Sequence, residues 1–109
     1  MKRFLPSFLL LTGLSASVLA FAEPAIDAAR QQELKYLLKQ DCGSCHGLTL
    51  KGGLGPALLP QNLAGKPIEF LTLTILDGRP GTAMPPWRPL LKPQEARWLA
   101  QLLSRGEAL

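Results

Sequence analysis

The sequence is poor in the large side chains that fill protein cores. Only 6% of its 109 residues are aromatic, whereas glycine and proline number ten each. Glycine and proline interrupt regular elements, and the length allows one small domain. The chain also lacks a dense basic stripe, since 12 Lys and Arg stand against 8 Asp and Glu. Nucleic-acid binders depend on such a stripe for their phosphate contacts, so the composition excludes that class.

The first residues are typical of an export signal. Lys2 and Arg3 precede a long apolar stretch that ends at Ala20-Phe21-Ala22, the small–x–small pattern that signal peptidase cleaves. We expect residues 1–22 to be a cleaved signal peptide and residues 23–109 to be the mature domain, exported to the periplasm without stable membrane insertion. The alternative is an uncleaved anchor, because the stretch nearly reaches the roughly 18–20 residues of a membrane-spanning helix.

The rest of the chain predicts a small, all-α and loop-rich domain. Helical patterns run from Asp27 to about Gln40, from Pro67 to Leu76, and from Pro93 to a stop at Gly106. The intervening segments, Cys42–Lys66 and Arg79–Leu91, are rich in glycine and proline and are expected to be loops. Long loops in a small domain are normally functional, and a domain of this size usually needs a disulfide, a metal or a cofactor for stability.

Cys42-Gly43-Ser44-Cys45-His46 is a C-x-x-C-H sequence, the pattern of covalent c-type haem attachment. Two thiols separated by two residues can each add to one vinyl group of the same porphyrin. The adjacent histidine can then bind the iron from one face. The motif therefore predicts one covalent haem c.

Three other uses of the two cysteines are open. A thioredoxin-like dithiol needs a βαβ context, and no strand is predicted here. A disulfide between Cys42 and Cys45 suits an exported protein but closes only a small loop and stabilises little. A zinc site needs further ligands, and His46 is the only histidine in the chain.

The second axial ligand is sought by elimination. A second histidine is absent, and Met1 would leave with the signal peptide, so Met84 is the only thioether of the mature chain. It lies in a proline-rich loop, where flanking prolines stiffen the backbone. The alternatives are an ordinary core methionine, an open iron site or a lysine ligand.

These features resemble the small monohaem class I cytochromes c over essentially the whole mature length. The resemblance rests on the helix before Cys42, the C-x-x-C-H motif, the segment Gly55-Pro56-Ala57-Leu58, and the Met84-Pro85 loop with the terminal helix. The stretch from Ile75 to Trp87 is similar to the cytochrome c-55x group, the NirC type, which is encoded with the haem c/haem d1 nitrite reductase of denitrifiers.

The resemblance implies a class I cytochrome c fold, in which three main helices and long loops surround one covalent haem. Cys42 and Cys45 would form the thioethers, and His46 and Met84 would be the proximal and distal iron ligands. Pro56 would pack against the proximal imidazole, and a carbonyl near it would accept a hydrogen bond from the other ring nitrogen. At the last helix, Lys92 replaces the Ser or Thr N-cap that the family often has, which predicts a weaker cap.

The function implied is electron transfer without catalysis. By resemblance, nitrite reductase is the expected acceptor and the respiratory chain the expected donor. Two alternatives keep the same haem: redox support for haem d1 assembly, and a gas-binding sensor in which Met84 dissociates. Arg79, Arg88 and Trp87 flank Met84 and are candidates for hydrogen bonds to haem propionates, or else form a solvated rim and a core aromatic.

Overall fold

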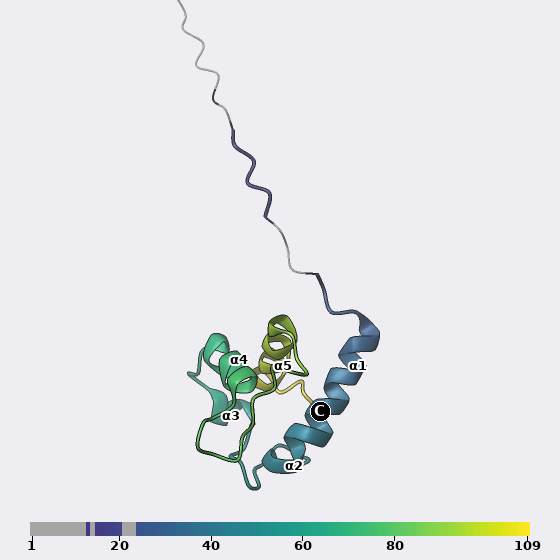
Figure 1. The fold of residues 1–109 in the computed structure, drawn as a ribbon, viewed down its shortest axis with the longest axis vertical. Coiled ribbons are helices and arrows are strands. Elements are labelled where there is room, and N and C mark those ends of the chain that lie inside the picture. Colours follow the sequence, from purple (N-terminus) through teal and green to yellow (C-terminus); the bar gives the residue numbers. More distant parts are fainter. Residues whose placement is uncertain (1–12, 14, 21–23) are drawn as a thin grey trace, which may run out of the picture.

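Figure 1 shows the fold in a computed structural model, which describes residues 13, 15–20 and 24–109. The expected cleavage site and most of the expected signal peptide lie outside these residues. The described part of the chain contains helices and no strand, so the all-α prediction is confirmed. Within the same residues, no helix combines the length and apolar character needed to cross a membrane.

Three helical elements follow one another without a break at the start of the domain. They are α1 (Ala28–Leu37), the π-helical turn η1 (Leu38–Cys42) and α2 (Gly43–His46). The first begins at an N-cap, where the Asp27 side chain accepts the backbone N–H of Arg30 at 2.8 Å.

The prediction of a loop starting at Cys42 was wrong at its first residues, because Gly43–His46 is helical. In η1 the Gly43 N–H bonds to the Leu38 carbonyl, five residues back. Such a turn holds one more residue than an α-turn and shifts the positions that follow it. The apolar spacing of a regular helix therefore ends at Leu38, although the helix itself continues.

The loop prediction was also wrong at α3 (Pro60–Leu63), a single helical turn inside the segment expected to be irregular. Proline favours the first position of a helix because its fixed backbone angle suits that place and its missing N–H is not needed there. Four residues are too few to show a helical period, so the sequence gives no periodic signal for this turn. Leu63 is buried and joins the core.

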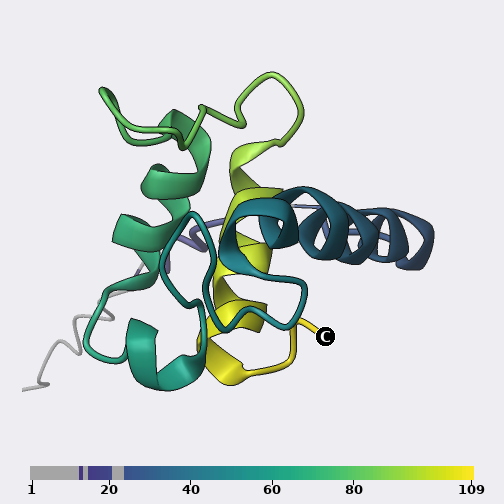
Figure 2. The ribbon, with the colours of Figure 1, turned by 90° about the horizontal axis from the view of Figure 1, so that it is seen from below.

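Two longer helices complete the fold: α4 (Ile68–Asp77) and α5 (Pro93–Arg105). They pack against each other, and α5 also contacts α1 and α3. Figure 2 shows α1 crossing α5 while α4 runs along its other side. α5 ends at Gly106, which adopts the left-handed conformation (φ 72°) that favours glycine.

The start of α5 is capped by an acidic side chain. Lys92 offers no side-chain hydrogen bond, as expected from the missing Ser or Thr. The Glu95 carboxylate instead accepts the backbone N–H of Lys92 at 2.9 Å, which is one half of a capping box. The cap is therefore supplied from the third helical position.

The core lies where these helices meet. Its four fully buried large side chains are Leu34, Leu38, Leu76 and Leu99, from α1, η1, α4 and α5. Leu91, just before α5, is also buried. Cys42 ends η1, Cys45 and His46 follow it in α2, and the loop with Met84 joins α4 to α5, so the packing of the core sets the frame for the candidate site.

Candidate haem site

The C-x-x-C-H residues lie at the end of the first helical rod. Cys42 closes η1, and Cys45 and His46 belong to α2, while the Ser44 hydroxyl donates to the Asp41 carbonyl at 2.7 Å. Both thiols are free. Burial is the main cause that raises the pKa of the Cys42 thiol to about 11, because the thiolate is poorly solvated there.

A single hydrogen bond orients the histidine. His46 Nδ1 lies 2.7 Å from the carbonyl oxygen of Pro56. A carbonyl oxygen can only accept, so the ring carries its proton on Nδ1 and leaves the lone pair of Nε2 unprotonated. Imidazoles that bind metals are commonly fixed in this way through the other ring nitrogen. The residue expected to lie beside the imidazole is thus also the one that supplies the carbonyl.

The loop after His46 folds back onto the motif. Backbone N–H groups of Gly52 and Gly55 donate to the carbonyls of His46 and Cys45, both at 2.8 Å. A Cβ on Gly55 would lie 2.7 Å from His46 Cε1 and 2.8 Å from Nδ1. Glycine is therefore required at position 55 by the closeness of the imidazole.

Met84 is carried by the loop between α4 and α5. Its carbonyl accepts the N–H of Arg79 at 3.1 Å, and its own N–H donates to the Thr82 hydroxyl at 3.3 Å. Gly78 has a positive φ of 65°, and a Cβ there would lie 2.6 Å from the Met84 carbonyl oxygen. The end of α4 thus fits closely against the backbone of Met84.

All five predicted site residues line one cavity of about 540 Å³, a size that is ordinary for cofactor pockets. Apolar side chains from η1, α3, α4 and α5 and from both long loops form much of its wall. The principal ones are Leu38, Leu54, Leu58, Leu63, Phe70, Leu71, Ile75, Trp87, Leu99 and Leu103.

The three residues considered as hydrogen-bond donors to the haem propionates do not all lie at the cavity. Arg79 and Trp87 line the cavity, whereas Arg88 does not. The Arg88 guanidinium instead pairs with Asp77 at 2.5 Å. Arg88 is therefore placed away from the haem site.

Sequence reasoning gave no role to several side chains of the cavity wall. Phe70 lines it from α4 and Leu54 from the loop after the motif. The sequence could have pointed to Phe70 as a wall residue, because it is the only phenylalanine beyond residue 22. Lys66 is the second cation on the wall beside Arg79.

The residues present fit a covalently attached haem. Two free thiols and an imidazole with an available Nε2 line a largely apolar cavity, which Met84, from the other half of the sequence, lines as well. The one position where a side chain would press on the imidazole holds glycine. Thiols, imidazole and thioether are the groups by which proteins hold haem c.

Comparison with known proteins shows the family of the chain. The sequence profile of a family described as cytochrome c oxidase, cbb3-type, subunit III, matches residues 29–103. Cytochrome c55X of Paracoccus denitrificans is 58% identical over 81 residues, which cover 74% of this chain and 79% of that protein. Cytochrome c55X of Pseudomonas aeruginosa is 60% identical over 81 residues, which cover 74% and 68%. The chain belongs to the cytochrome c55X family.

Solved structures extend the comparison to the fold. A c-type cytochrome NirC has a TM-score of 0.75 and 59% identity, over 76% of this chain and 98% of that one. The dihydro-heme d1 dehydrogenase NirN, in complex with DHE, has a TM-score of 0.60 and 36% identity, over 64% of this chain and 15% of NirN. The expected resemblance to NirC-type cytochromes c is confirmed, and the cofactor of this c55X cytochrome is one covalent haem c.

Gly55→Ala tests whether the loop and the imidazole are in contact. The new methyl group must displace the His46 ring or the loop, so we expect a loss of about 1–3 kcal/mol in the free energy of unfolding, typical of overpacking. Urea unfolding measures that loss, and the visible spectrum of the haem should shift with the ring. The control is Gly65→Ala, where φ is 77° but no atom lies within 4 Å of the added Cβ. It should cost about 1–2 kcal/mol of backbone strain and leave the spectrum unchanged; an unchanged spectrum in Gly55→Ala contradicts the contact.

Proposed function

We propose that this cytochrome is a periplasmic one-electron carrier of the nitrite reductase system and performs no bond chemistry. Cys42 and Cys45 would form the thioethers, His46 would bind the iron through Nε2, and Met84 would supply a thioether sulfur as the second protein ligand. The observation that supports this assignment is the single cavity that all four side chains line. Pro56 orients the imidazole, because its backbone carbonyl accepts the hydrogen bond from His46 Nδ1.

The residues around the haem would set its reduction potential and hold its ligands in place. The haem supplies the one-electron chemistry. The Met84 thioether favours ferrous iron, and the apolar wall disfavours the additional charge of ferric iron, so both raise the reduction potential. The hydrogen bond from His46 to Pro56 and the close fit of Gly78 against Met84 hold the two ligands in place in both oxidation states.

We further propose that residues 1–22 are removed during export. Purified mature protein should then begin at Glu23, and its mass should equal that of residues 23–109 plus one haem. Mass spectrometry of the intact protein checks both statements, because a thioether-bound haem stays with the chain during denaturation. A chain that retains Met1 contradicts cleavage, and a haem that separates in acid acetone contradicts covalent attachment.

The proposed partners are the haem c/haem d1 nitrite reductase as acceptor and a respiratory-chain component as donor. The cavity wall carries two cations, Lys66 and Arg79, and one acidic residue, Asp41. A positive edge of this kind steers association with an acidic partner, and the effect weakens as salt rises.

Stopped-flow mixing tests the role as donor. Ferrous cytochrome mixed with oxidised nitrite reductase should be oxidised within the turnover time of that enzyme, and the rate should fall as ionic strength rises. Lys66→Gln together with Arg79→Gln should weaken the salt dependence, whereas Arg105→Gln, a control at the far end of α5, should not. Oxidation much slower than turnover contradicts the proposal.

A second candidate keeps the same haem and concerns haem d1 assembly. The dihydro-heme d1 dehydrogenase of Pseudomonas aeruginosa is 41% identical over 61 residues, which cover 55% of this chain and 12% of that enzyme. A dehydrogenation releases two electrons, so two copies of a one-electron carrier would accept them. Rapid reduction of the ferric cytochrome by that enzyme and its substrate, with slow oxidation by nitrite reductase, would favour this role.

Met84→Ala tests the distal ligand and separates a carrier from a gas sensor. In the wild type both oxidation states should be low-spin and slow to bind carbon monoxide, because sulfur occupies the sixth position. The variant should admit water, give high-spin ferric iron, bind carbon monoxide rapidly and have a lower reduction potential. The control is Leu73→Ala, an exposed side chain on α4 that does not line the cavity. Rapid carbon monoxide binding by the unmutated protein would instead favour the sensor with a labile Met84.

A further inference from the structure

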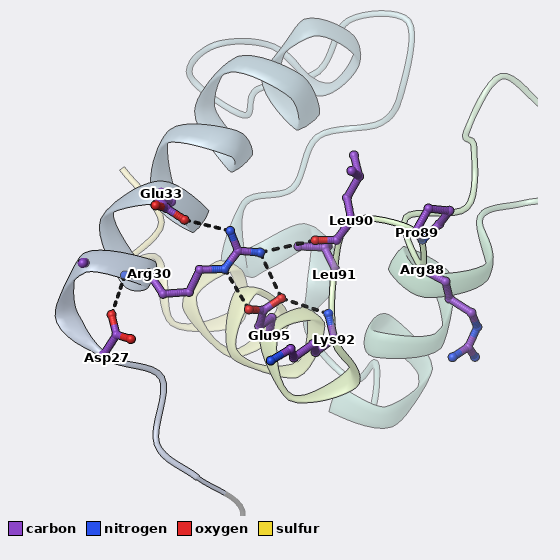
Figure 3. Close-up of a pocket in the computed structure, with 10 residues that line it drawn as sticks. Asp27, Arg30, Glu33, Arg88, Pro89, Leu90, Leu91, Lys92 and Glu95 are labelled. Atoms are coloured by element: carbon purple, nitrogen blue, oxygen red, sulfur yellow. Dashed lines mark hydrogen bonds and ion pairs between the residues drawn. The ribbon is translucent and has the colours of Figure 1, made fainter.

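An ion pair between Arg30 and Glu95 joins α1 to the first turn of α5, next to the end of the loop that carries Met84; the carboxylate is buried and the Arg30 side chain is 34% exposed. Figure 3 shows the Arg30 guanidinium of α1 between Glu95 and Glu33, close to Leu90. Its Nε donates to one Glu95 carboxylate oxygen at 2.8 Å and its Nη2 to the other at 3.2 Å. The same Nη2 donates to the Leu90 carbonyl at 3.3 Å, and Nη1 donates to Glu33 at 2.9 Å.

This pair differs in burial from the other ion pairs among the described residues. The Glu95 side chain is 7% exposed, whereas the carboxylates of Glu33, Glu69 and Asp77 are 66%, 68% and 52% exposed. The hydrogen bond from Arg30 lowers the pKa of the Glu95 carboxyl, so that side chain is ionised at neutral pH. A buried carboxylate that loses its cation is strongly destabilised.

The contacts of Arg30 with the loop complement those made by α4. The N–H of Trp87 donates to the carbonyls of Ile75 and Leu76, and that of Arg88 donates to Leu76. These backbone bonds hold the middle of the loop against α4. In the described part of the chain, the N-terminal half is hydrogen-bonded to this loop through the bond from Arg30 Nη2 to the Leu90 carbonyl.

We propose that Arg30 is a positioning residue for Met84: by binding the Leu90 carbonyl and the Glu95 carboxylate together, it keeps the loop closed over the haem cavity. This inference rests on the proposed role of Met84 as the distal ligand. Arg30 with its two partners, Glu95 and Leu90, is called the Arg30 clamp below.

The arrangement gives one side chain a means of acting on a distant ligand. Glu95 also caps α5 through the Lys92 N–H at 2.9 Å. The guanidinium therefore ties together α1, the first turn of α5 and the last residues of the loop. Opening of the loop around Met84 has to break these charge-assisted hydrogen bonds or strain the backbone before Leu90.

The test is the rate at which the ferrous holoprotein binds carbon monoxide, a rate that depends on how often Met84 leaves the iron. Arg30→Ala should raise that rate at least about tenfold, the factor expected from losing one charge-assisted hydrogen bond. Arg30→Lys keeps the charge but offers no planar fork and should restore the rate in part. The matched control is Glu33→Gln, which removes the exposed partner of Arg30, leaves the clamp intact and should keep the wild-type rate.

Two further variants separate positioning from general destabilisation. The double variant Arg30→Ala with Glu95→Gln removes the carboxylate charge that the single variant would leave buried without a partner. It should therefore fold even where Arg30→Ala does not. It should still bind carbon monoxide faster than the wild type. Leu102→Ala weakens the core at the other end of α5, where Leu102 is buried. It should lower the free energy of unfolding without raising the carbon monoxide rate.

An unchanged carbon monoxide rate in both Arg30→Ala and the double variant, with a slow wild type, overturns the Arg30 clamp and leaves Met84 as the ligand. An equal increase in Leu102→Ala also overturns it, because the effect would then be one of stability alone. A wild type that binds carbon monoxide as fast as Met84→Ala overturns the assignment of Met84, and the inference about Arg30 falls with it.

Discussion

The hydrogen bond between His46 Nδ1 and the Pro56 carbonyl is the interaction on which the rest of the site depends. It fixes the tautomer of the only histidine and leaves the Nε2 lone pair available for the iron ligation proposed above. It also joins α2, which carries Cys45 and His46, to the loop that follows it. That loop approaches closely because Gly55 has no side chain to collide with the imidazole. One donor and one acceptor thus determine both the chemistry of the ligand and the path of the loop.

The second half of the site is held in a different way. Met84 lies on a loop without regular structure, so its position depends on contacts at both ends of that loop. At one end, Gly78 and the Arg79 N–H meet the Met84 carbonyl; at the other, Arg30 and Glu95 bind the last residues before α5. Under the proposed function, a thioether held from both sides would remain on the iron in either oxidation state, as a carrier requires.

Much of this site could be predicted from the sequence because its signals are local. The spacing of Cys42, Cys45 and His46 indicates haem attachment, and elimination leaves Met84 as the one thioether beyond residue 22. Helix ends at Gly78 and elsewhere follow from glycine and proline.

The parts that sequence reasoning missed are short or long-range. The π-helical turn η1 breaks the helical period by one residue, and α3 is too short to have one. The Arg30–Glu95 pair joins residues 65 positions apart, and nothing in a single sequence indicates that those two charges meet. Its effect on the loop is visible only once α1 and α5 are packed together.

The most direct test of this account is iron K-edge X-ray absorption of the purified holoprotein in both oxidation states. Sulfur and nitrogen scatter differently, so the number of sulfur ligands can be counted without mutation. The account predicts one sulfur ligand from Met84 together with nitrogen ligands from the porphyrin and His46, in the ferric and the ferrous state alike. Iron surrounded by nitrogen and oxygen alone, in either state, would contradict the carrier site described above.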